Sequence, residues 1–321
     1  MWTLWLDEPL PASCAPTLEG RARVLGPAET LEGFDAADAC IAPGHIRYDA
    51  ARLDRAPRLK VLARLGVGYD NVDLDAATAR GIVVVYAPDG PTISTAEHTW
   101  ALMLAVARKL NTAQEAVHTG QWASFYAREE TNGIELWGCT IGLVGAGRIG
   151  ARVARFARAF EMRVLAFDPA LDESRAAELG VERAESLESL LAVADVVTLH
   201  VPYTPSTHHL MNAQRFAQMK RGALFINTAR GSLVDEVALI AALRSGHLGG
   251  AGLDVFSTEP LPLDHPLLDC PNVVVTPHIA SRTSAGRRRM WEITLQQALQ
   301  ALAGEMPTHI LNPQVWPYRR R

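Results

Sequence analysis

Three side chains suited to acid–base chemistry and anion binding each follow a short apolar run in the second half of the sequence: Arg230, Glu259 and His278. An arginine binds a carboxylate through two parallel hydrogen bonds. A histidine exchanges a proton near neutral pH, and a glutamate beside it would stabilise the protonated ring. Because ligands bind outside the carboxyl ends of parallel strands, we expect the three side chains to share one site.

A glycine-rich turn at residues 145–150 supplies a second kind of chemistry. It follows an apolar run at 140–144 and leads into a helical pattern, and the next apolar run ends at Asp168. This order is typical of a dinucleotide site. The first glycine permits a tight turn, the second lets a pyrophosphate approach the backbone, and the third lets the helix pack close to the strand. Asp168 would accept the ribose hydroxyls and repel a 2′-phosphate, which predicts NAD rather than NADP as cofactor.

The elements that must position these groups alternate between apolar runs and helical patterns, which predicts parallel sheets covered by helices. The expected strands are 4–6, 39–41, 61–65 and 82–86 in the first third, and 140–144, 163–167, 195–199, 223–226, 251–255 and 273–276 further on. The second set has the size of a complete Rossmann unit.

Four helices are expected at 73–80, 95–117, 236–244 and 284–302, the first with Asp73 as its cap and the second bridging two domains. The helix at 284–302 is followed by no further strand of the second set, so we infer that the chain returns to complete the first domain. The predicted fold is α/β, with two doubly wound parallel-sheet domains. A Rossmann nucleotide-binding domain (99–284) is inserted in a flavodoxin-like substrate domain (1–98 and 285–321).

Composition narrows the function classes. The chain has 321 residues, 48% of them hydrophobic, with a net charge of −4, so it suits two globular domains and has no general affinity for nucleic acid. Its four cysteines are scattered and form no metal-like cluster, so we expect no metal site. The sequence shows no membrane-length apolar run and does not start like a signal peptide, so a cytoplasmic protein is expected.

The ordered motifs resemble those of the D-isomer-specific 2-hydroxyacid dehydrogenases, in particular phosphoglycerate dehydrogenases. The resemblance covers nearly the whole chain. Its motifs lie at 65–73, 95–98, 120–122, 145–150, 200–207, 226–236, 252–260 and 276–280.

The resemblance implies a role for each matched position. His278 is expected to be the general acid/base, Glu259 its partner, and Arg230 the clamp on the substrate carboxylate and carbonyl. The amides of Val67 and Gly68 would hold the substrate carboxylate from the other domain. The implied cofactor-binding residues are Thr95, Gly145, Gly147, Arg148, Ile149, Gly150, Asp168, Val201, Thr207, Thr228, Asp254 and Ala280, with Asp254 contacting the nicotinamide carboxamide.

Several alternatives remain open. Arg64 resembles a phosphate-contacting arginine of phosphoglycerate dehydrogenases, which favours 3-phosphoglycerate, but glyoxylate or hydroxypyruvate is also compatible. The same fold and the same His/Arg pair serve enzymes that oxidise phosphite or formate. A non-enzymatic alternative is an NAD-sensing protein like the corepressors that share the fold. The expected partners are a small 2-hydroxy or 2-keto acid and a second copy of the chain.

Overall fold

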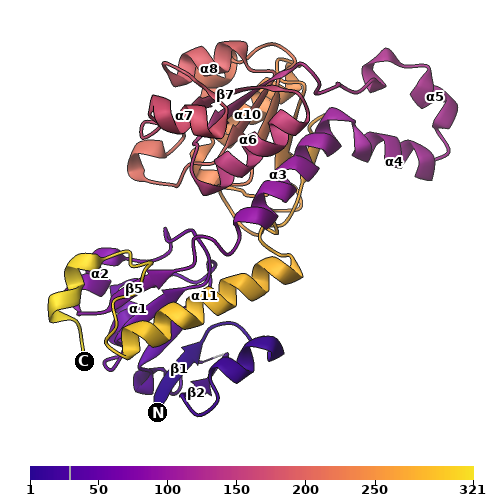
Figure 1. Ribbon diagram of the computed structural model, residues 1–321. Helices are drawn as coiled ribbons and strands as arrows, with labels where there is room; N and C mark the ends of the chain where they lie inside the picture. Colours follow the sequence, from indigo (N-terminus) through magenta and orange to yellow (C-terminus); the bar gives the residue numbers. More distant parts are fainter. Residues whose placement is uncertain (29) are drawn as a thin grey trace. The chain divides into compact units, whose positions relative to one another are not determined.

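The computed structural model describes residues 1–28 and 30–321, which divide into two compact units (Figure 1). Unit 1 comprises Met1–Thr92 and Arg282–Arg321, and unit 2 comprises Ile93–Ser281. Unit 2 is therefore one continuous segment inserted in unit 1. The boundaries expected from the sequence, after residues 98 and 284, lie inside helix α3 (Thr92–Ala107) and at the start of helix α11 (Ser284–Leu302).

Unit 1 contains a five-stranded parallel sheet in the order β2-β1-β3-β4-β5. Its strands are β1 (Trp2–Leu6), β2 (Ala22–Leu25), β3 (Ala39–Ala42), β4 (Val61–Arg64) and β5 (Val83–Tyr86). This order is that of flavodoxin-like sheets, in agreement with the predicted fold class. Strand β2 was not predicted, because it is a short edge strand whose side chains are only partly buried.

Alternate side chains of this sheet feed two cores, as the two-residue period of a strand requires. On one face, Cys40 and Leu62 pack with the short helices α1 (Ala50–Asp54) and α2 (Leu74–Ala79). On the other face, Ile41 and Val61 pack with α11 (Ser284–Leu302). The predicted return of the chain to unit 1 is therefore confirmed.

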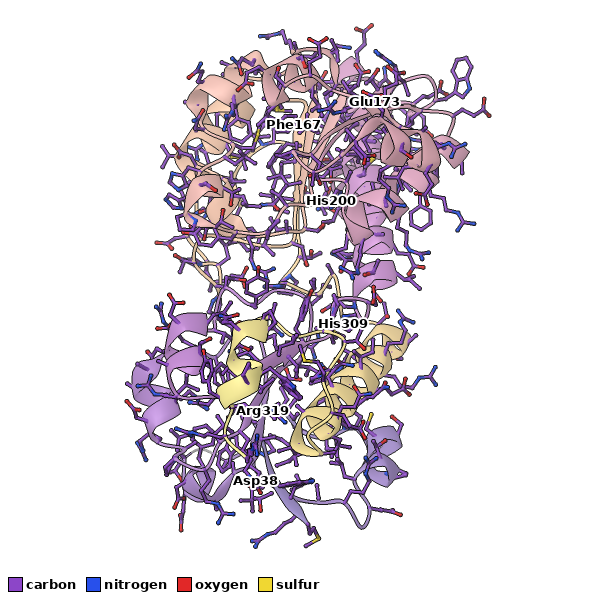
Figure 2. The ribbon with its side chains drawn as sticks, turned by 60° about the vertical axis from the view of Figure 1, so that its left-hand side comes forward. Asp38, Phe167, Glu173, His200, His309 and Arg319 are labelled. Atoms are coloured by element: carbon purple, nitrogen blue, oxygen red, sulfur yellow. The ribbon has the colours of Figure 1, made fainter. Side chains whose placement is uncertain are left out.

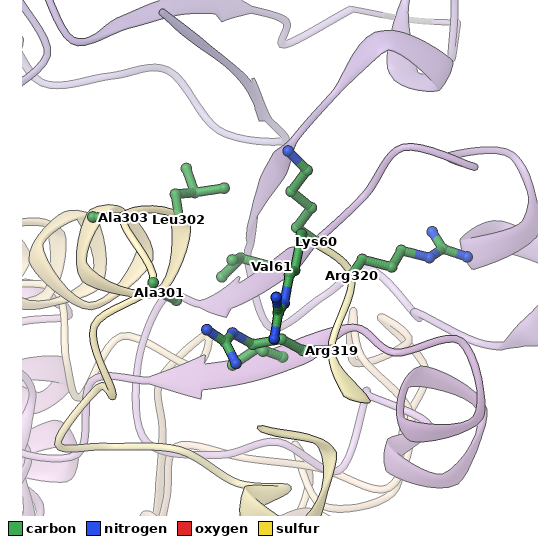
Figure 3. Close-up of a pocket in the computed structure, with 10 residues that line it drawn as sticks. Lys60, Val61, Ala301, Leu302, Ala303, Arg319 and Arg320 are labelled. Atoms are coloured by element: carbon green, nitrogen blue, oxygen red, sulfur yellow. The ribbon is translucent and has the colours of Figure 1, made fainter. Parts of the chain in front are cut away.

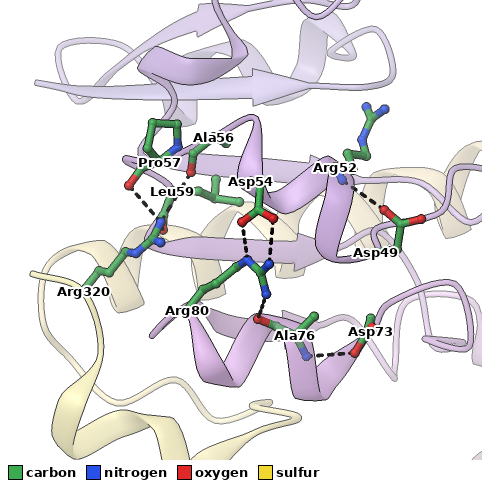
Figure 4. Close-up of polar contacts among 10 residues, drawn as sticks. All are labelled: Asp49, Arg52, Asp54, Ala56, Pro57, Leu59, Asp73, Ala76, Arg80 and Arg320. Carbon is green, nitrogen blue, oxygen red and sulfur yellow. Dashed lines mark hydrogen bonds and ion pairs between the residues drawn. The ribbon is translucent and has the colours of Figure 1, made fainter.

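Local polar contacts fix the ends of these elements (Figure 4). The Asp73 carboxylate accepts a hydrogen bond from the Ala76 amide at 2.8 Å, which confirms the predicted cap. Arg80, directly after α2, binds the two carboxylate oxygens of Asp54 at 2.8 Å each. Near the C-terminus, Arg320 donates to backbone carbonyls that precede β4, so the tail is fastened to the sheet.

Unit 2 contains a seven-stranded parallel sheet in the order β12-β11-β10-β9-β6-β7-β8. Its strands are β6 (Thr140–Val144), β7 (Arg163–Phe167), β8 (Glu182–Arg183), β9 (Val196–Leu199), β10 (Leu224–Asn227), β11 (Gly250–Leu253) and β12 (Val273–Val275). The direction of winding reverses between β6 and β9, as in a Rossmann fold, so the carboxyl ends of these two strands flank the expected ligand crevice. Only β8, a two-residue edge strand, was not predicted.

Helices cover both faces of this sheet (Figure 1). Val196 of β9 packs into a core with α3 and α6, and the next residue, Val197, packs into the opposite core with α8, α9 and α10. The helices of unit 2 are α3 (Thr92–Ala107), α4 (Leu110–His118), α5 (Trp122–Tyr126), α6 (Arg148–Ala159), α7 (Glu173–Leu179), α8 (Leu187–Val193), α9 (Ala213–Gln218) and α10 (Glu236–Arg244).

The prediction of a single helix at 95–117 is wrong, because the structure has two helices there. Helix α3 ends at Ala107 and α4 begins at Leu110, because Lys109 between them adopts a left-handed backbone conformation with φ of 51°. The break lets α4 and α5 extend away from the sheet of unit 2 as an arm (Figure 1). In the part of the chain that the structure describes, no helix combines the length and the apolar character that a bilayer crossing requires.

Candidate active site

The glycine turn has the backbone geometry that its sequence predicts. Gly145 has φ of 99°, and a Cβ atom there would lie 2.7 Å from the carbonyl oxygen of His200. A Cβ on Gly150 would lie 2.2 Å from the carbonyl oxygen of Gly145, so the first turn of α6 packs directly on the loop. A Cβ on Gly147 would meet no atom within 4 Å. Gly145 and Gly150 are thus required by the fold, whereas Gly147 is not, and the turn fits a bound pyrophosphate.

Two polar side chains border this turn. The Asp168 carboxylate, at the end of β7, accepts hydrogen bonds from the amides of Ala146 and Ala170 at 2.9 Å each. His200, labelled in Figure 2, follows β9, and its carbonyl oxygen lies against Gly145 of the turn. Its Nε2 lies 3.1 Å from the Thr198 hydroxyl. Burial lowers the pKa of His200 to about 3, so the ring is neutral at physiological pH.

Glu259 and His278 form the central pair of the site. His278 Nδ1 lies 2.7 Å from Glu259 Oε2, while Glu259 Oε1 accepts a hydrogen bond from the Phe256 amide at 3.0 Å. Burial alone would raise the pKa of Glu259, but the hydrogen bonds from His278 and Phe256 and the nearby charges of His278 and Arg230 outweigh burial and lower this pKa. The ionised carboxylate fixes the ring orientation and leaves Nε2 as the nitrogen available for proton exchange.

The backbone of His278 is held by Asp254, a fully buried residue directly after β11. His278 has φ of 53°, a left-handed conformation that costs a non-glycine residue about 1–3 kcal/mol. The Asp254 carboxylate accepts hydrogen bonds from the amides of Ile279 at 2.9 Å and Ala280 at 2.8 Å, and the Asp254 carbonyl accepts one from the His278 amide at 2.9 Å. These bonds compensate for the unfavourable backbone conformation.

Arg230 lies on the loop that follows β10, and this loop is fixed by its own hydrogen bonds. The Asn227 side chain donates to the Arg230 carbonyl at 2.9 Å and accepts from the Ala229 amide at 3.0 Å. A Cβ on Gly231 would lie 1.9 Å from the carbonyl carbon of Phe256. The loop carrying Arg230 therefore touches the loop that leads to Glu259. Unit 2 thus brings Arg230, Glu259 and His278 to the same edge of its sheet.

Comparison with known proteins shows to which family the chain belongs. A family model described as "D-isomer specific 2-hydroxyacid dehydrogenase, NAD binding domain" matches residues 100–280. The chain belongs to the D-isomer-specific 2-hydroxyacid dehydrogenase family. Unit 2, with its glycine turn, contains all of the matched residues.

Individual relatives of this dehydrogenase-family chain differ in length. A D-3-phosphoglycerate dehydrogenase of Methanocaldococcus jannaschii is 41% identical over 88% of the chain and 53% of its own length. The chain therefore spans about half the length of that relative. A glyoxylate reductase of Korarchaeum cryptofilum is 43% identical over 83% of the chain and 80% of its own length. The crystal structure of the TT0316 protein from Thermus thermophilus has a TM-score of 0.87 and 42% identity, covering 96% of this chain and 99% of that one.

Two of the hydroxyl groups expected to bind cofactor in this dehydrogenase-family chain, those of Thr207 and Thr228, have protein partners. Thr99 donates to the Thr95 carbonyl at 2.8 Å and lies 2.8 Å from the Thr228 hydroxyl. The Thr207 hydroxyl accepts from the Thr204 amide at 2.8 Å within a short turn. Val201, by contrast, lies against the glycine turn, since a Cβ on Gly145 would come within 2.9 Å of its side chain.

The candidate substrate residues of this family member in unit 1 lie at the end of β4 (Arg64) and in the loop after it (Val67 and Gly68). Arg64 is buried, with its Nε 3.3 Å from the Asn71 side-chain oxygen, and it also donates to the Leu65 carbonyl. A Cβ on Gly66 would lie 3.1 Å from the guanidinium group of Arg64. Arg64 therefore supports the loop that continues into Val67 and Gly68.

A separate pocket of about 300 Å³ in unit 1 contains none of the expected site residues of this dehydrogenase-family chain (Figure 3). Four cations line it, and two of them have the following partners: Lys60 pairs with Asp38 at 3.4 Å, and the Arg319 guanidinium carbon lies 3.7 Å from the centre of the Trp316 ring. We therefore do not assign the active site to this pocket.

Sequence reasoning missed two residues that support the site in this family member. His98 and Thr276 lie in motifs of the resemblance but were given no role, although both contact Asp254. The only signal in the sequence was the place of Thr276, close to His278 in the chain.

Proposed function

We propose that the protein transfers a hydride between NAD and the C2 atom of a D-2-hydroxy acid or 2-keto acid. The observation that supports this most directly is the 2.7 Å pair of His278 and Glu259 at the sheet edge that also carries Arg230 and the glycine turn. Bound NAD would supply or accept the hydride. In this proposal unit 2 is the nucleotide domain and unit 1 is the substrate domain.

The protein's own residues perform the proton and charge chemistry. During reduction, His278 Nε2 donates a proton to the substrate oxygen, and during oxidation it accepts one. Glu259 holds Nδ1 throughout and stabilises the protonated ring. Arg230 binds the carboxylate and stabilises the negative charge that develops on the carbonyl oxygen. The amides of Val67 and Gly68 are the proposed carboxylate donors of unit 1.

Asp168 supports NAD as the preferred cofactor. Its carboxylate is fixed beside the glycine turn by the amides of Ala146 and Ala170. A carboxylate in this place repels a 2′-phosphate and accepts hydrogen bonds from ribose hydroxyls. For the same reason, we expect the protein to prefer NADH to NADPH.

Small keto acids such as glyoxylate and hydroxypyruvate are the substrates that the geometry supports best. Arg64 is buried and its guanidinium group contacts Asn71 and Leu65 within its own loop, which supports a role in holding that loop. The phosphorylated substrate of phosphoglycerate dehydrogenases remains the second candidate, because 41% identity to such an enzyme favours it.

The decisive experiment follows NADH absorbance with glyoxylate, hydroxypyruvate and phosphohydroxypyruvate. We expect saturable oxidation of NADH with at least one of them and a much lower kcat/KM with NADPH. The His278→Ala variant should lose about 10²- to 10⁴-fold in kcat because the proton donor is gone, while NADH still quenches protein fluorescence on binding.

Two results would contradict the proposal. Near-normal turnover in His278→Ala would remove His278 from the chemistry. Tight NADH binding without turnover of any of the three acids, in the unmodified protein, would favour the NAD-sensing alternative.

We also propose that the protein is a homodimer. The α4–α5 arm exposes Val117, Trp122 and Tyr126, with relative exposures of 57%, 60% and 76%. The rings of Trp122 and Tyr126 are stacked, with centroids 6.3 Å apart. Large apolar side chains gathered on one projecting segment are typical of a protein interface.

A further inference from the structure

His98 is the outermost member of a hydrogen-bond chain that ends at the backbone of His278. It lies on α3, and its side chain is 18% exposed. His98 Nε2 lies 2.9 Å from the Thr276 hydroxyl and 3.4 Å from Asp254 Oδ1. Asp254 in turn binds the amides of the two residues that follow His278, Ile279 and Ala280. One side chain of α3 is thus linked to the loop that carries the proposed acid.

The direction of each hydrogen bond between His98, Thr276 and Asp254 follows from the single proton of the Thr276 hydroxyl. The Thr276 hydroxyl has one proton, which it donates to Asp254 Oδ1 at 2.5 Å. Thr276 must therefore accept the bond from His98, so Nε2 of His98 carries a proton and donates it. By donating to the Thr276 hydroxyl, His98 strengthens the hydrogen bond from Thr276 to the Asp254 carboxylate. The N–H group of His98 is also a second donor close to that carboxylate.

Asp254 depends on these donors because it is buried. Burial alone would raise its pKa, but the hydrogen bonds from His98, Thr276 and the two amides outweigh burial and lower this pKa. Only an ionised carboxylate can accept from all of these groups at once. The loop therefore keeps its conformation while the donors around Asp254 remain in place.

The conformation of the loop matters because His278 has a left-handed backbone. A residue in that region stays there only when its surroundings hold it. Here the amide of His278 is bound by the Asp254 carbonyl, and the next two amides are bound by the Asp254 carboxylate. A small rotation at Asp254 would therefore turn the imidazole relative to Glu259 and to the substrate.

We propose that His98 is a positioning residue for the reaction: by donating a hydrogen bond to Thr276 beside Asp254, it holds the loop that orients His278. This inference rests on the proposed function, since it assigns His98 a part in the same chemistry. His98 acts through Thr276 and Asp254, and not by direct contact with His278 or the reacting atoms.

The test compares two substitutions that differ in their ability to donate. His98→Phe keeps a ring of similar size but removes the donor, and His98→Gln provides an amide N–H in about the same place. We expect His98→Phe to lower kcat by about 10- to 100-fold, the cost of a misplaced reacting group, with the KM for NADH changed less than about 3-fold. His98→Gln should recover most of kcat.

His247→Phe is the matched control. His247 is a partly buried histidine of the same unit, and its Nε2 lies 3.0 Å from the Phe216 carbonyl, near the amino ends of the strands. Loss of the hydrogen bond from His247 to the Phe216 carbonyl should change kcat by less than about 2-fold. Unchanged kcat in His98→Phe, or an equal loss in His98→Phe and His98→Gln, would overturn the proposal, because donation would then not be what matters.

A second measurement separates this proposal from the proposed function. Hydrogen–deuterium exchange at the amides of 278–280 needs no turnover, and it should be faster in His98→Phe than in the unmodified protein and in His98→Gln. If the unmodified protein turns over no keto acid, the proposed function fails, while faster exchange in His98→Phe alone still supports the positioning role. Equal exchange in all three proteins would refute that role whatever the activity.

Discussion

His278 and Glu259 show how two adjacent loops can orient one proposed proton donor. The carboxylate of Glu259 has one oxygen on the His278 ring and the other on the Phe256 amide. The ring orientation is therefore set by a group that is itself fixed to the backbone. Such support keeps a catalytic side chain within the narrow range of positions that reaction geometry requires.

His200 should make stability depend on pH below neutrality. Its pKa in the folded protein, about 3, is below the value of 6.5 for a free histidine. The unfolded chain therefore binds the proton more readily, and the free energy of unfolding should fall as pH decreases from 6.5 towards 3, by about 1.4 kcal/mol per pH unit.

This dependence can be measured by urea unfolding of the unmodified protein and of His200→Gln at pH 7 and pH 5. The unmodified protein should lose about 2 kcal/mol more than the variant over this interval. Carboxylates such as Glu259 titrate in both proteins, so their effects cancel in the comparison. Parallel losses in the two proteins would show that His200 is not the responsible group.

At the same scale, the sequence singled out the three proposed catalytic residues but not the side chains that hold their loops. Arg230, Glu259 and His278 each follow a strand closely, and strand ends are visible as the ends of apolar runs. His98 is far from Thr276 in sequence, and only the folding of α3 against the sheet brings their side chains to 2.9 Å. Long-range pairs of this kind leave no periodic signal.

The elements around the site differ in how clearly the sequence marks them. The interior strands β6 and β7 match their predicted ranges because each is a short continuous apolar run, and the helices α10 and α11 match theirs because apolar residues recur at helical spacing. The edge strands β2 and β8 lack this signal, since few of their side chains are buried. The break at Lys109 escaped prediction because it contains neither proline nor glycine.

The loop between β6 and α6 yields a prediction that separates folding from binding. Gly150→Ala should destabilise the protein by about 1–3 kcal/mol, because its Cβ would overlap the Gly145 carbonyl. Gly147→Ala should leave the melting temperature nearly unchanged, because nothing lies within 4 Å of its Cβ. It should still raise the Kd for NADH at least about 10-fold if the pyrophosphate approaches the backbone there.

Thermal melts and NADH titrations of the two variants would check this pair of outcomes. An unaltered Kd in Gly147→Ala would remove that residue from the cofactor site. An unaltered melting temperature in Gly150→Ala would show that the helix can move away from the turn without cost.

For the whole molecule, the proposed dimer depends on the α4–α5 arm. The double substitution Trp122→Glu with Tyr126→Glu should convert a dimer to a monomer in sedimentation velocity, because two charges would be buried without partners. Val237→Glu is the control, since Val237 is also an apolar residue of unit 2, with 78% exposure on α10, but lies outside the arm. A dimer that survives the double substitution would place the interface elsewhere.

The inserted arrangement of the two units also sets the order in which their cores can be completed during translation. Residues 1–92 leave the ribosome first, yet one face of their sheet is covered by α11, which is made only after all of unit 2. Until residues 284–302 emerge, the face containing Ile41 and Val61 has no permanent cover. Unit 2 is a continuous segment and can fold while it is synthesised. The nascent chain therefore acquires its nucleotide-binding half before the half that was begun first, and the early strands must avoid aggregation in the meantime.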